Sequence, residues 1–502
     1  MSPRRKVLFR TAAVLLGLSV FLLCELICRL GGWGEQATAT DAFTEFVGLR
    51  PLFQLSPDRQ RYDVAANRRL YFAEESFPAQ KAPGHRRVFV FGGSTVQGRP
   101  FSIPTAFSTF LKIGLRHADP TVSWEVVNCG GVSYASYRLL PIMRECLQYE
   151  PDLYIVCTGH NEFLECITYA EVRNSSELLK QTHGLLCQLR TVQILRETLR
   201  SLSPESGAST SAPLPARPLL PEEVDVLLDH QGGLEAYTRE ALQSTQIVRQ
   251  FRINLTQMAE LTEQAGVPLL FISPPSSLGD CPPFKSEFSA DTTPEASAHI
   301  LALLDNATAV SADRADKVVG RLKEAVHTDP SFAFAWYELG HALLNANRSD
   351  EALAAFIRAK DEDICPLRMT SALQQVMADV ARTHDIPLLD AHQLMAGLSR
   401  NGIVGDGMLV DHIHPSFRGH QQIALAIIQQ FRELELLPPD TAEWEPAAQS
   451  AFEEHVLSLD DLYFLRGQRT LQTLQAWAQG RGDGPPLVRT SDEGSPAADK
   501  NN

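Results

Sequence analysis

The sequence predicts an α/β fold in which helices cover both faces of a parallel β-sheet. Short apolar segments with the length of buried strands alternate with longer segments that have helical periodicity. Strands that alternate with helices along a chain form parallel βαβ units. The predicted strands are residues 87–91, 124–128, 153–158, 267–273 and 386–389. The predicted helices between and after them are residues 105–117, 135–149, 236–265, 369–384 and 416–435.

The composition is that of an acidic, folded protein with several structural units. The chain has 502 residues, of which 44% are hydrophobic and 21% are charged, and its formal net charge is −15. This length exceeds that of one domain of about 100–200 residues. A protein that binds nucleic acid needs a basic face to neutralise phosphates. We therefore expect no nucleic acid among the partners.

The chain contains nine cysteines but no CxxC pair. This spacing predicts neither a zinc ribbon nor a thioredoxin-like site. Cys281 and Cys365 could form a disulfide in an oxidising compartment or remain free thiols. No H-E-x-x-H motif accompanies the histidines near residue 414. We therefore expect no metal and no other cofactor.

The N-terminus has the features of a membrane anchor. Four basic residues precede a mostly apolar run at residues 11–28. The run is longer than the apolar region of a usual signal peptide, and no A-x-A cleavage site follows it. A basic flank stays in the cytoplasm. We therefore expect one transmembrane helix in a bacterial inner membrane, with the rest of the chain in the periplasm. A cleaved signal peptide and a buried helix of a soluble protein are the alternatives.

Two segments interrupt the alternation of strands and helices. Residues 201–221 are rich in Ser, Pro and Ala, which predicts a flexible loop. Residues 286–366 are helical and resemble one tetratricopeptide repeat, in which small residues let two helices pack closely. The residues that carry this pattern are Trp336, Leu339, Gly340, Leu343, Ala352, Phe356 and Ala359. One repeat cannot bury its apolar face alone, so it must pack on the rest of the chain or on a protein partner. An ordinary helical hairpin is the alternative.

These features divide the chain into five parts. They are the cytoplasmic flank and anchor at residues 1–36, the first part of the α/β domain at residues 37–285, the helical insertion at residues 286–366, the second part of the α/β domain at residues 367–440, and a C-terminal part at residues 441–502. The last part combines one predicted helix at residues 447–479 with an end that is rich in Gly, Pro, Asp and Ser. That composition predicts disorder.

Four short blocks contain the residues that could carry chemistry. They are FGGSTVQG at residues 91–98, NCGGVSYASY at residues 128–137, TGHNEF at residues 158–163 and DHIHPSFRGH at residues 411–420. The first three follow predicted strands, and the carboxyl ends of parallel strands form the edge where open α/β folds place their sites. A single Gly-Gly-Ser or D-x-x-H sequence is often only a turn. The order of all four is what makes them informative.

Together, the four blocks resemble the SGNH (GDSL-like) hydrolase family, which is named for a Ser, a Gly, an Asn and a His in blocks of this order. The resemblance covers roughly residues 85–165, 266–275 and 385–435. The whole chain looks like a membrane-anchored subgroup that carries a tetratricopeptide-like insert. The resemblance implies a three-layer, flavodoxin-like fold and the hydrolysis of an ester by an activated serine.

The resemblance assigns a role to each matching residue. Ser94 is then the nucleophile, His414 is the general base, and Asp411 orients the His414 ring. A neutral serine is a poor nucleophile near pH 7, so it needs such a base. The oxyanion would be bound by the backbone N–H of Ser94, by a backbone N–H of the second block, assigned to Ser133, and by the side-chain amide of Asn161.

Three positions depart from the family pattern. Gly93 stands where an acidic residue usually precedes the nucleophile, and Glu162 stands where the family often has Asp. The glycine of the second block falls on Ser133, although Gly130 and Gly131 are close by, and Gly131 could contact the substrate. A backbone N–H donor does not require glycine. The departures therefore remove no reacting atom, but the second-block donor stays open.

Two further features lie near the predicted site. His412 and His420 flank the general base and are expected to be surface or packing residues. Residues 273–288 follow the fourth predicted strand and would reach the same sheet edge as Ser94. They could shape the substrate pocket, with Lys285 as a contact to an anionic group, or could form a Pro-rich connector.

The predicted function is the hydrolysis of an O-acyl ester in the periplasm, on an acylated glycan or lipid. An O-acyltransferase with the same triad would instead pass the acyl group to a polysaccharide hydroxyl. A third hypothesis is a non-catalytic scaffold of the cell envelope that binds a protein through the tetratricopeptide-like segment. The complete set of triad residues argues against this third hypothesis.

Overall fold

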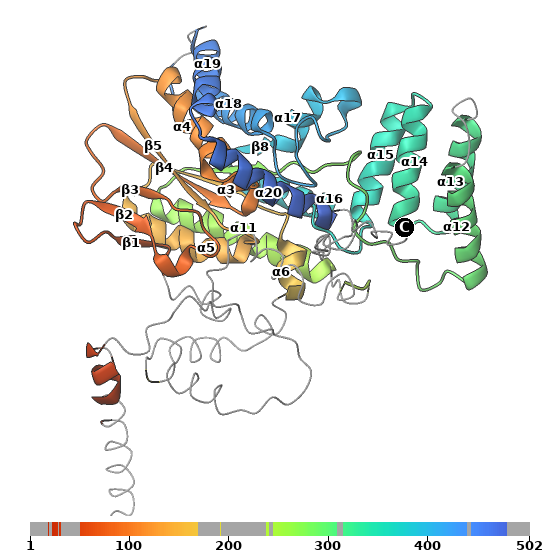
Figure 1. The fold of residues 1–502 in the computed structure, drawn as a ribbon, viewed down its shortest axis with the longest axis horizontal. Coiled ribbons are helices and arrows are strands. Elements are labelled where there is room, and N and C mark those ends of the chain that lie inside the picture. The colour runs from red at the N-terminus through yellow and green to blue at the C-terminus, as the bar shows by residue number, and fades with distance from the viewer. Residues whose placement is uncertain are drawn as a thin grey trace, which may run out of the picture. The chain divides into compact units, whose positions relative to one another are not determined.

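The computed structural model describes residues 19, 23–28, 30–31, 51–168, 191, 237–239, 244–308, 315–438 and 443–478. The chain divides into two compact units. The first comprises residues 1–52, 65–70 and 169–219, and the second comprises residues 53–64, 71–168 and 220–502. Both β-sheets belong to the second unit (Figure 1).

Several sequence predictions fall mainly outside the described residues. They concern the anchor at residues 1–36, the loop at residues 201–221 and the tail that begins at residue 480. Within the ranges that the structure describes, no helix is both long enough and apolar enough to cross a membrane.

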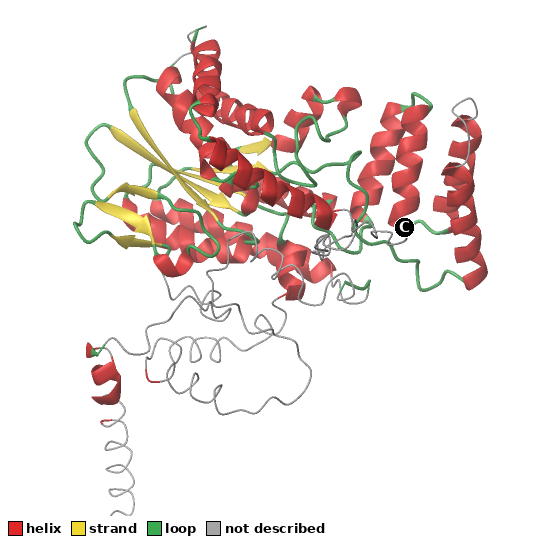
Figure 2. Ribbon diagram, viewed as in Figure 1, coloured by secondary structure: helices red, strands yellow, loops and turns green. Residues whose placement is uncertain are grey.

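A five-stranded parallel sheet forms the centre of the second unit (Figure 2). Its strands are β4 (His85–Gly92), β5 (Ser123–Gly130), β6 (Leu153–Cys157), β7 (Leu269–Ser273) and β8 (Leu388–Asp390). The spatial order is β5-β4-β6-β7-β8. Counted along the chain, this is the order 2-1-3-4-5 of flavodoxin-like folds. The prediction of a parallel α/β sheet is therefore confirmed.

Helices cover both faces of this sheet. One group consists of α4 (Phe107–Ala118), α18 (Phe417–Glu433) and α19 (Trp444–Leu457), and the other of α5 (Ser136–Cys146), α11 (Ser244–Ala265) and α16 (Ser371–Thr383). Successive β4 side chains point to opposite faces. Val88 and Val90 join the aliphatic core under the first group. Phe89 and Phe91 pack against Tyr154, whose hydroxyl donates to a carbonyl of α5. Burial on both faces explains why these strands read as continuous apolar runs.

The remaining described elements are short. They are α3 (Ser94–Gln97), α6 (Glu162–Thr168), α17 (Ala391–Leu398) and the 3-10 turns Ala66–Arg68, Ile103–Thr105, Leu147–Tyr149 and Arg400–Gly402. A small antiparallel sheet contains β1 (Phe53–Leu55), β2 (Arg61–Val64) and β3 (Ser76–Pro78). The sequence does not predict this sheet, because strands of only three or four residues are too short to show an alternating apolar pattern.

Four helices between β7 and α16 build the predicted insertion. They are α12 (Pro294–Thr308), α13 (Ala315–Thr328), α14 (Ala333–Asn345) and α15 (Ser349–Asp361), and each packs on the next (Figure 1). Their hydrophobic core also includes Leu278, which follows β7, and packs against Ile403. A β-carbon on Gly340 would lie 2.7 Å from the Phe356 ring, so this position needs glycine for α14 and α15 to approach. The resemblance of this segment to a tetratricopeptide repeat stays a prediction.

The C-terminal part forms two helices, α19 and α20 (Asp461–Ala478), instead of the single helix predicted at residues 447–479. The side chain of Asp460 accepts a hydrogen bond from the backbone N–H of Tyr463 at 2.7 Å. This contact caps the first turn of α20 and explains why a new helix begins there. Trp444 and Phe452 of α19 are buried in the core of the α/β sheet.

Candidate active site

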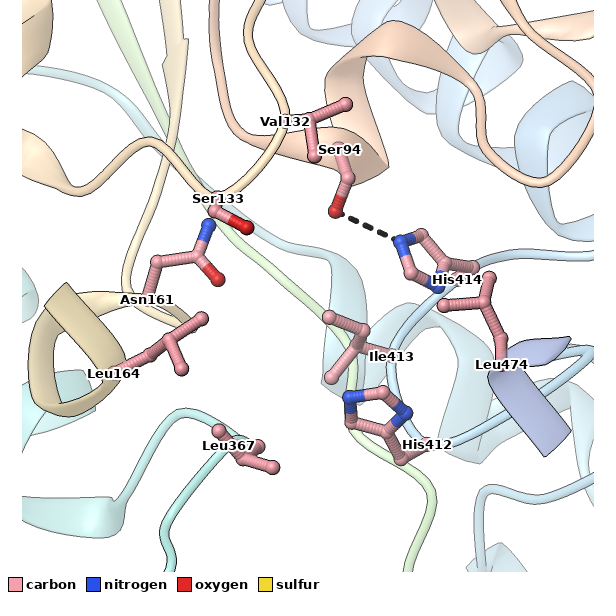
Figure 3. Close-up of a pocket in the computed structure, with 10 residues that line it drawn as sticks. All are labelled: Ser94, Val132, Ser133, Asn161, Leu164, Leu367, His412, Ile413, His414 and Leu474. Atoms are coloured by element: carbon pink, nitrogen blue, oxygen red, sulfur yellow. Dashed lines mark hydrogen bonds between the residues drawn. The ribbon is translucent and has the colours of Figure 1, made fainter. Parts of the chain in front are cut away.

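Ser94 lies where β4 ends and the one-turn helix α3 begins. Glycines make the sharp turn possible, since a β-carbon on Gly92 would lie only 2.2 Å from the Cys157 carbonyl oxygen. The Oγ atom of Ser94 is 2.8 Å from Nε2 of His414 (Figure 3). Ser94 is 7% exposed and His414 is 2% exposed. The candidate nucleophile and its base are therefore in hydrogen-bond contact in a buried site.

His414 and Asp411 come from a tight loop that precedes α18. The Val410 N–H donates to the His414 carbonyl at 2.9 Å, and Ser416 caps α18 by accepting from the Gly419 N–H at 3.2 Å. Nδ1 of His414 lies 2.6 Å from Oδ2 of Asp411. This arrangement joins Ser94, His414 and Asp411 in one chain of hydrogen bonds.

Asp411 holds both the loop and the imidazole ring. Its Oδ1 atom accepts from the backbone N–H groups of Ile413 at 2.9 Å and His414 at 2.8 Å. Burial alone would raise the Asp411 pKa, but electrostatic interaction with the His414 and His412 rings and the hydrogen bonds from His414 keep that pKa well below its usual range. An ionised Asp411 accepts the Nδ1–H of His414. This leaves Nε2 free to accept the Ser94 proton.

Three N–H donors surround the space beside the Ser94 hydroxyl. Asn161 follows β6, and its Nδ2 donates one hydrogen bond to the Tyr134 carbonyl at 3.1 Å. A side-chain amide has two N–H hydrogens, so one remains available. Within the described part of the chain, the backbone N–H groups of Ser94 and Ser133 donate to no protein acceptor. Ser133 has a φ of 58°, the left-handed conformation that glycine adopts most easily.

These residues line one cavity of about 30 Å³. Its walls consist of Ser94, Val132, Ser133, Asn161, Leu164, Leu367, His412, Ile413, His414 and Leu474 (Figure 3). A water-sized group needs about 10–15 Å³ on this measure. The space beside Ser94 therefore admits a small group such as an ester carbonyl.

Glu162, one of the departures from the family pattern, has a structural partner. Its carboxylate accepts from the backbone N–H of Ser136 at 2.9 Å and from the Ser136 hydroxyl at 2.8 Å. These bonds satisfy a donor at the first turn of α5. Glu162 thus ties the block after β6 to the block after β5.

Two residues predicted to contact substrate lie outside the cavity walls. The N–H of Gly131 donates to the Gly92 carbonyl at 3.0 Å, and a β-carbon at Gly131 would lie 2.8 Å from the Phe72 and Tyr134 rings. Nζ of Lys285 donates to the Tyr237 carbonyl at 2.6 Å and forms an ion pair with a neighbouring glutamate at 3.1 Å. Both residues therefore have contacts within the protein, and their predicted contact with substrate stays a prediction.

The two histidines that flank the base are both buried. His412 lines the cavity, and its ring packs edge-on against Phe284 at 5.1 Å. Nδ1 of His420 accepts from the Phe107 N–H at 3.2 Å, which caps α4. Burial lowers the pKa of His412 to about 4 and that of His420 to about 3. Both rings are therefore neutral near pH 7.

The structure describes no group of His, Cys, Asp and Glu residues with the geometry of a metal site, within the ranges given above. Cys281 and Cys365 are both buried, and neither forms a disulfide. Burial raises the pKa of the Cys281 thiol to about 11. Such a thiol stays protonated near pH 7 and is unreactive.

Several residues that line the cavity were not predicted from the sequence. Val132, Leu164 and Ile413 adjoin the motif residues, so their proximity to the site could have been inferred from the blocks. Leu367 follows the helical insertion and Leu474 belongs to α20, far from every block. No local pattern marks these two leucines, because only the tertiary fold brings them to Ser94.

No model of a known protein family matches the sequence, and no curated protein matches it significantly. Solved structures similar to this chain include a lipase/acylhydrolase from Enterococcus faecalis, with 13% identity and a TM-score of 0.30 over 71% of this chain and 100% of the other. A GDSL-like lipase from Bacteroides thetaiotaomicron has 12% identity and a TM-score of 0.30, over 71% and 92%. A catalytic mutant of an acetylxylan esterase from Geobacillus stearothermophilus has 10% identity and a TM-score of 0.31, over 70% and 96%. The side-chain geometry, and not these overall likenesses, carries the function proposed below.

Proposed function

We propose that the protein is a serine-dependent ester hydrolase of the SGNH type, an O-acyl esterase that acts through Ser94, His414 and Asp411. The observation that carries this proposal is the unbroken chain of hydrogen bonds, 2.8 Å from Ser94 to His414 and 2.6 Å from His414 to Asp411. Acyl transfer to a serine requires a base that activates the hydroxyl and a further group that orients the base, and this arrangement supplies both.

In this mechanism, the Ser94 oxygen attacks the ester carbonyl carbon while Nε2 of His414 takes the hydroxyl proton. The negative oxygen that develops is stabilised by the N–H groups of Ser94 and Ser133 and by the Asn161 amide. His414 then gives the proton to the leaving alcohol, and the C–O bond of the ester breaks. A water molecule attacks the acyl-serine in the same way, and the acid leaves with Ser94 restored.

The cavity supports a substrate with a short acyl group. Apart from the catalytic groups and His412, its walls are apolar side chains, and its volume is about 30 Å³. A small acyl group such as acetyl matches this volume. We propose an acylated glycan or lipid of the periplasm as the source of such an ester. The basic flank and apolar run at the N-terminus support an inner-membrane anchor.

An O-acyltransferase with the same triad is the second candidate. The burial of Ser94 and His414, at 7% and 2% exposure, favours it, because transfer requires that water be kept from the acyl-serine. The two candidates differ only in the acceptor of the acyl group.

The test uses the full-length protein, solubilised in a mild detergent, with p-nitrophenyl acetate as substrate. We expect release of p-nitrophenol by the parent and a loss of at least about 10³-fold in kcat for Ser94→Ala. Ser297→Ala, a matched change on α12 in the helical insertion, should keep the parent rate. Equal activity of parent and Ser94→Ala would overturn the proposal. Acetylated sugar that accumulates when a polysaccharide is added would identify the transferase.

A further inference from the structure

The C-terminal helix α20 reaches the candidate active site although it belongs to none of the four sequence blocks. Its residue Leu474 is 8% exposed and lines the cavity together with Ser94 and His414. Other leucines of the same helix face solvent, since Leu462 is 53% exposed and Leu465 is 56% exposed. Of these three leucines, Leu474 alone lines the cavity.

Specific contacts hold α20 beside the two catalytic loops. Gly467 lies against the ring of Phe101, where a β-carbon would come within 2.0 Å. The Tyr463 hydroxyl is 2.7 Å from the hydroxyl of Thr105. Phe464 packs edge-on against Phe417 at 6.1 Å.

These partners belong to the segments that carry the triad. Phe101 follows α3, which begins with Ser94, and Phe417 lies three residues after His414. Their rings also contact each other at 4.6 Å. The helix is therefore fixed relative to both the nucleophile and the base.

The position of the base distinguishes the two ends of a bound ester. In the proposed mechanism His414 protonates the leaving oxygen, so the alcohol must pass beside Nε2 of His414. The donors for the carbonyl oxygen, Ser133 and Asn161, lie on the other side of the Ser94 hydroxyl (Figure 3). Leu474 and His414 line the same cavity and are drawn on the same side of the Ser94 hydroxyl, whereas Leu367 is drawn away from His414, below Leu164 (Figure 3).

We propose that Leu474 of α20 is the residue that restricts the alcohol side of the ester. This inference rests on the proposed esterase function and deepens it. The apolar wall beside His414 admits a slim, primary alcohol and excludes a bulky secondary one. It also limits which acceptor, water or a larger hydroxyl compound, can approach the acyl-serine.

The experiment compares esters that share one acyl group. The full-length parent and its variants hydrolyse ethyl acetate and cyclohexyl acetate, and the release of acetic acid is followed by titration at constant pH. We expect Leu474→Ala to raise the kcat/KM ratio of cyclohexyl to ethyl acetate by about tenfold or more, which is the effect of one or two methylene groups in an apolar pocket. The ratio of ethyl butyrate to ethyl acetate should change much less.

Two matched controls make the result specific. Leu465→Ala, on the exposed face of the same helix, should leave all the rates at the parent values. Leu367→Ala, which shortens another leucine of the cavity wall, should leave the alcohol ratio unchanged. Leu474→Val removes less of the side chain and serves as the second variant in case Leu474→Ala does not fold. It should change the ratio of cyclohexyl to ethyl acetate in the same direction.

The outcomes separate this inference from the proposed function. Suppose that the parent hydrolyses ethyl acetate and Ser94→Ala does not. If the kcat/KM ratio of cyclohexyl to ethyl acetate is then the same in the parent and in both Leu474 variants, Leu474 does not restrict the alcohol, while the proposed esterase function stands. An equal rise of the ratio in Leu367→Ala would also overturn the role. If the parent releases no acid and is not labelled by a fluorophosphonate, the esterase itself is wrong, and the inference falls with it.

Discussion

The side-chain amide of Asn161 occupies the space that a side chain at Gly93 would need. A β-carbon on Gly93 would lie 2.6 Å from Nδ2 of Asn161. The residue before the nucleophile and the candidate oxyanion donor are therefore coupled by packing. A larger side chain at residue 93 would displace the amide, so glycine at this position fits the placement of Asn161.

Gly93→Ala should therefore reduce catalysis without unfolding the protein. Gly93 has a φ of −86°, so alanine at this position does not need the left-handed conformation that favours glycine. The added methyl group displaces the Asn161 amide, and the loss of one oxyanion donor lowers kcat by about 10²–10³-fold. The measurement is kcat and KM on an acetate ester, together with the melting temperature.

The matched control for this change is Gly320→Ala on α13, where a β-carbon would meet no atom within 4 Å. It should keep the parent kcat and stabilise its helix by up to about 1 kcal/mol. Asn161→Ala should lose about as much kcat as Gly93→Ala, and the double variant should lose little more than either. A parent-like kcat in Gly93→Ala, or additive losses in the double variant, would refute the coupling.

Asp411→Asn should keep the fold of its loop and lower kcat by about 10⁴-fold. The asparagine oxygen can still accept from the N–H groups of Ile413 and His414. Its amide would donate to Nδ1 of His414, so the ring proton would move to Nε2 and block proton transfer from Ser94. The measurement is kcat on an acetate ester and the rate of labelling by a fluorophosphonate. Asp350→Asn, at an exposed position of α15, is the control, and equal rates in the two variants would contradict the role of Asp411.

The loop that carries Leu367 depends on a buried ion pair. Arg368 donates to the carbonyls of Ser277 at 3.0 Å and Cys281 at 2.8 Å, and it lies 3.3 Å from the Asp363 carboxylate. Burial raises the pKa of Asp363 to about 6, although the Arg368 charge acts against this rise.

Arg368→Met should lower the free energy of unfolding by about 3–5 kcal/mol, because it leaves a buried carboxylate unpaired. Adding Asp363→Asn should recover part of this loss, since the amide carries no charge. Denaturant unfolding of the two variants checks both statements. Arg382→Met, at an exposed position of α16, should cost less than about 1 kcal/mol. A similar small loss for Arg368→Met would show that the pair does not hold the loop.

The sequence predicts the central sheet well because its strands are buried on both faces. Residues 88–91 of β4 and all five residues of β6 have apolar or aromatic side chains, so their strand character needs no knowledge of the partner strands. The strands β1 to β3 and the break between α19 and α20 were not predicted. Strands of three or four residues have no measurable periodicity, and the helix break depends on one capping contact of Asp460.

The candidate site divides in a similar way. Ser94, Asn161 and His414 could be proposed because each lies in a block next to a strand or helix boundary, and the structure brings all three to one sheet edge. The cavity walls could not be proposed as readily. Leu367 and Leu474 are single leucines in unrelated segments. Their contact with the site depends on how the loop between α15 and α16 and the helix α20 pack in the folded protein. A position of this kind is set by tertiary structure alone.

A buried histidine near the site should make the protein lose stability at mildly acidic pH. Burial lowers the pKa of His420 to about 3, while the same ring in the unfolded chain titrates near pH 6.5. The stability from keeping this ring neutral is complete above about pH 6.5. It is lost as the pH falls toward 3, because the unfolded state then binds one more proton.

His420→Asn removes this titration but keeps an acceptor for the Phe107 N–H. We therefore expect the free energy of unfolding of the variant to fall less steeply between pH 6.5 and pH 4, by about 1.4 kcal/mol per pH unit relative to the parent. Urea denaturation at half-unit pH steps measures the two slopes, and any uniform loss of stability in the variant does not affect their difference. His299→Asn, at an exposed position of α12, should follow the parent curve. Parallel curves for the parent and His420→Asn would mean that the ring accepts a proton in the folded state as readily as in the unfolded one, and that its contact with Phe107 does not resist acid.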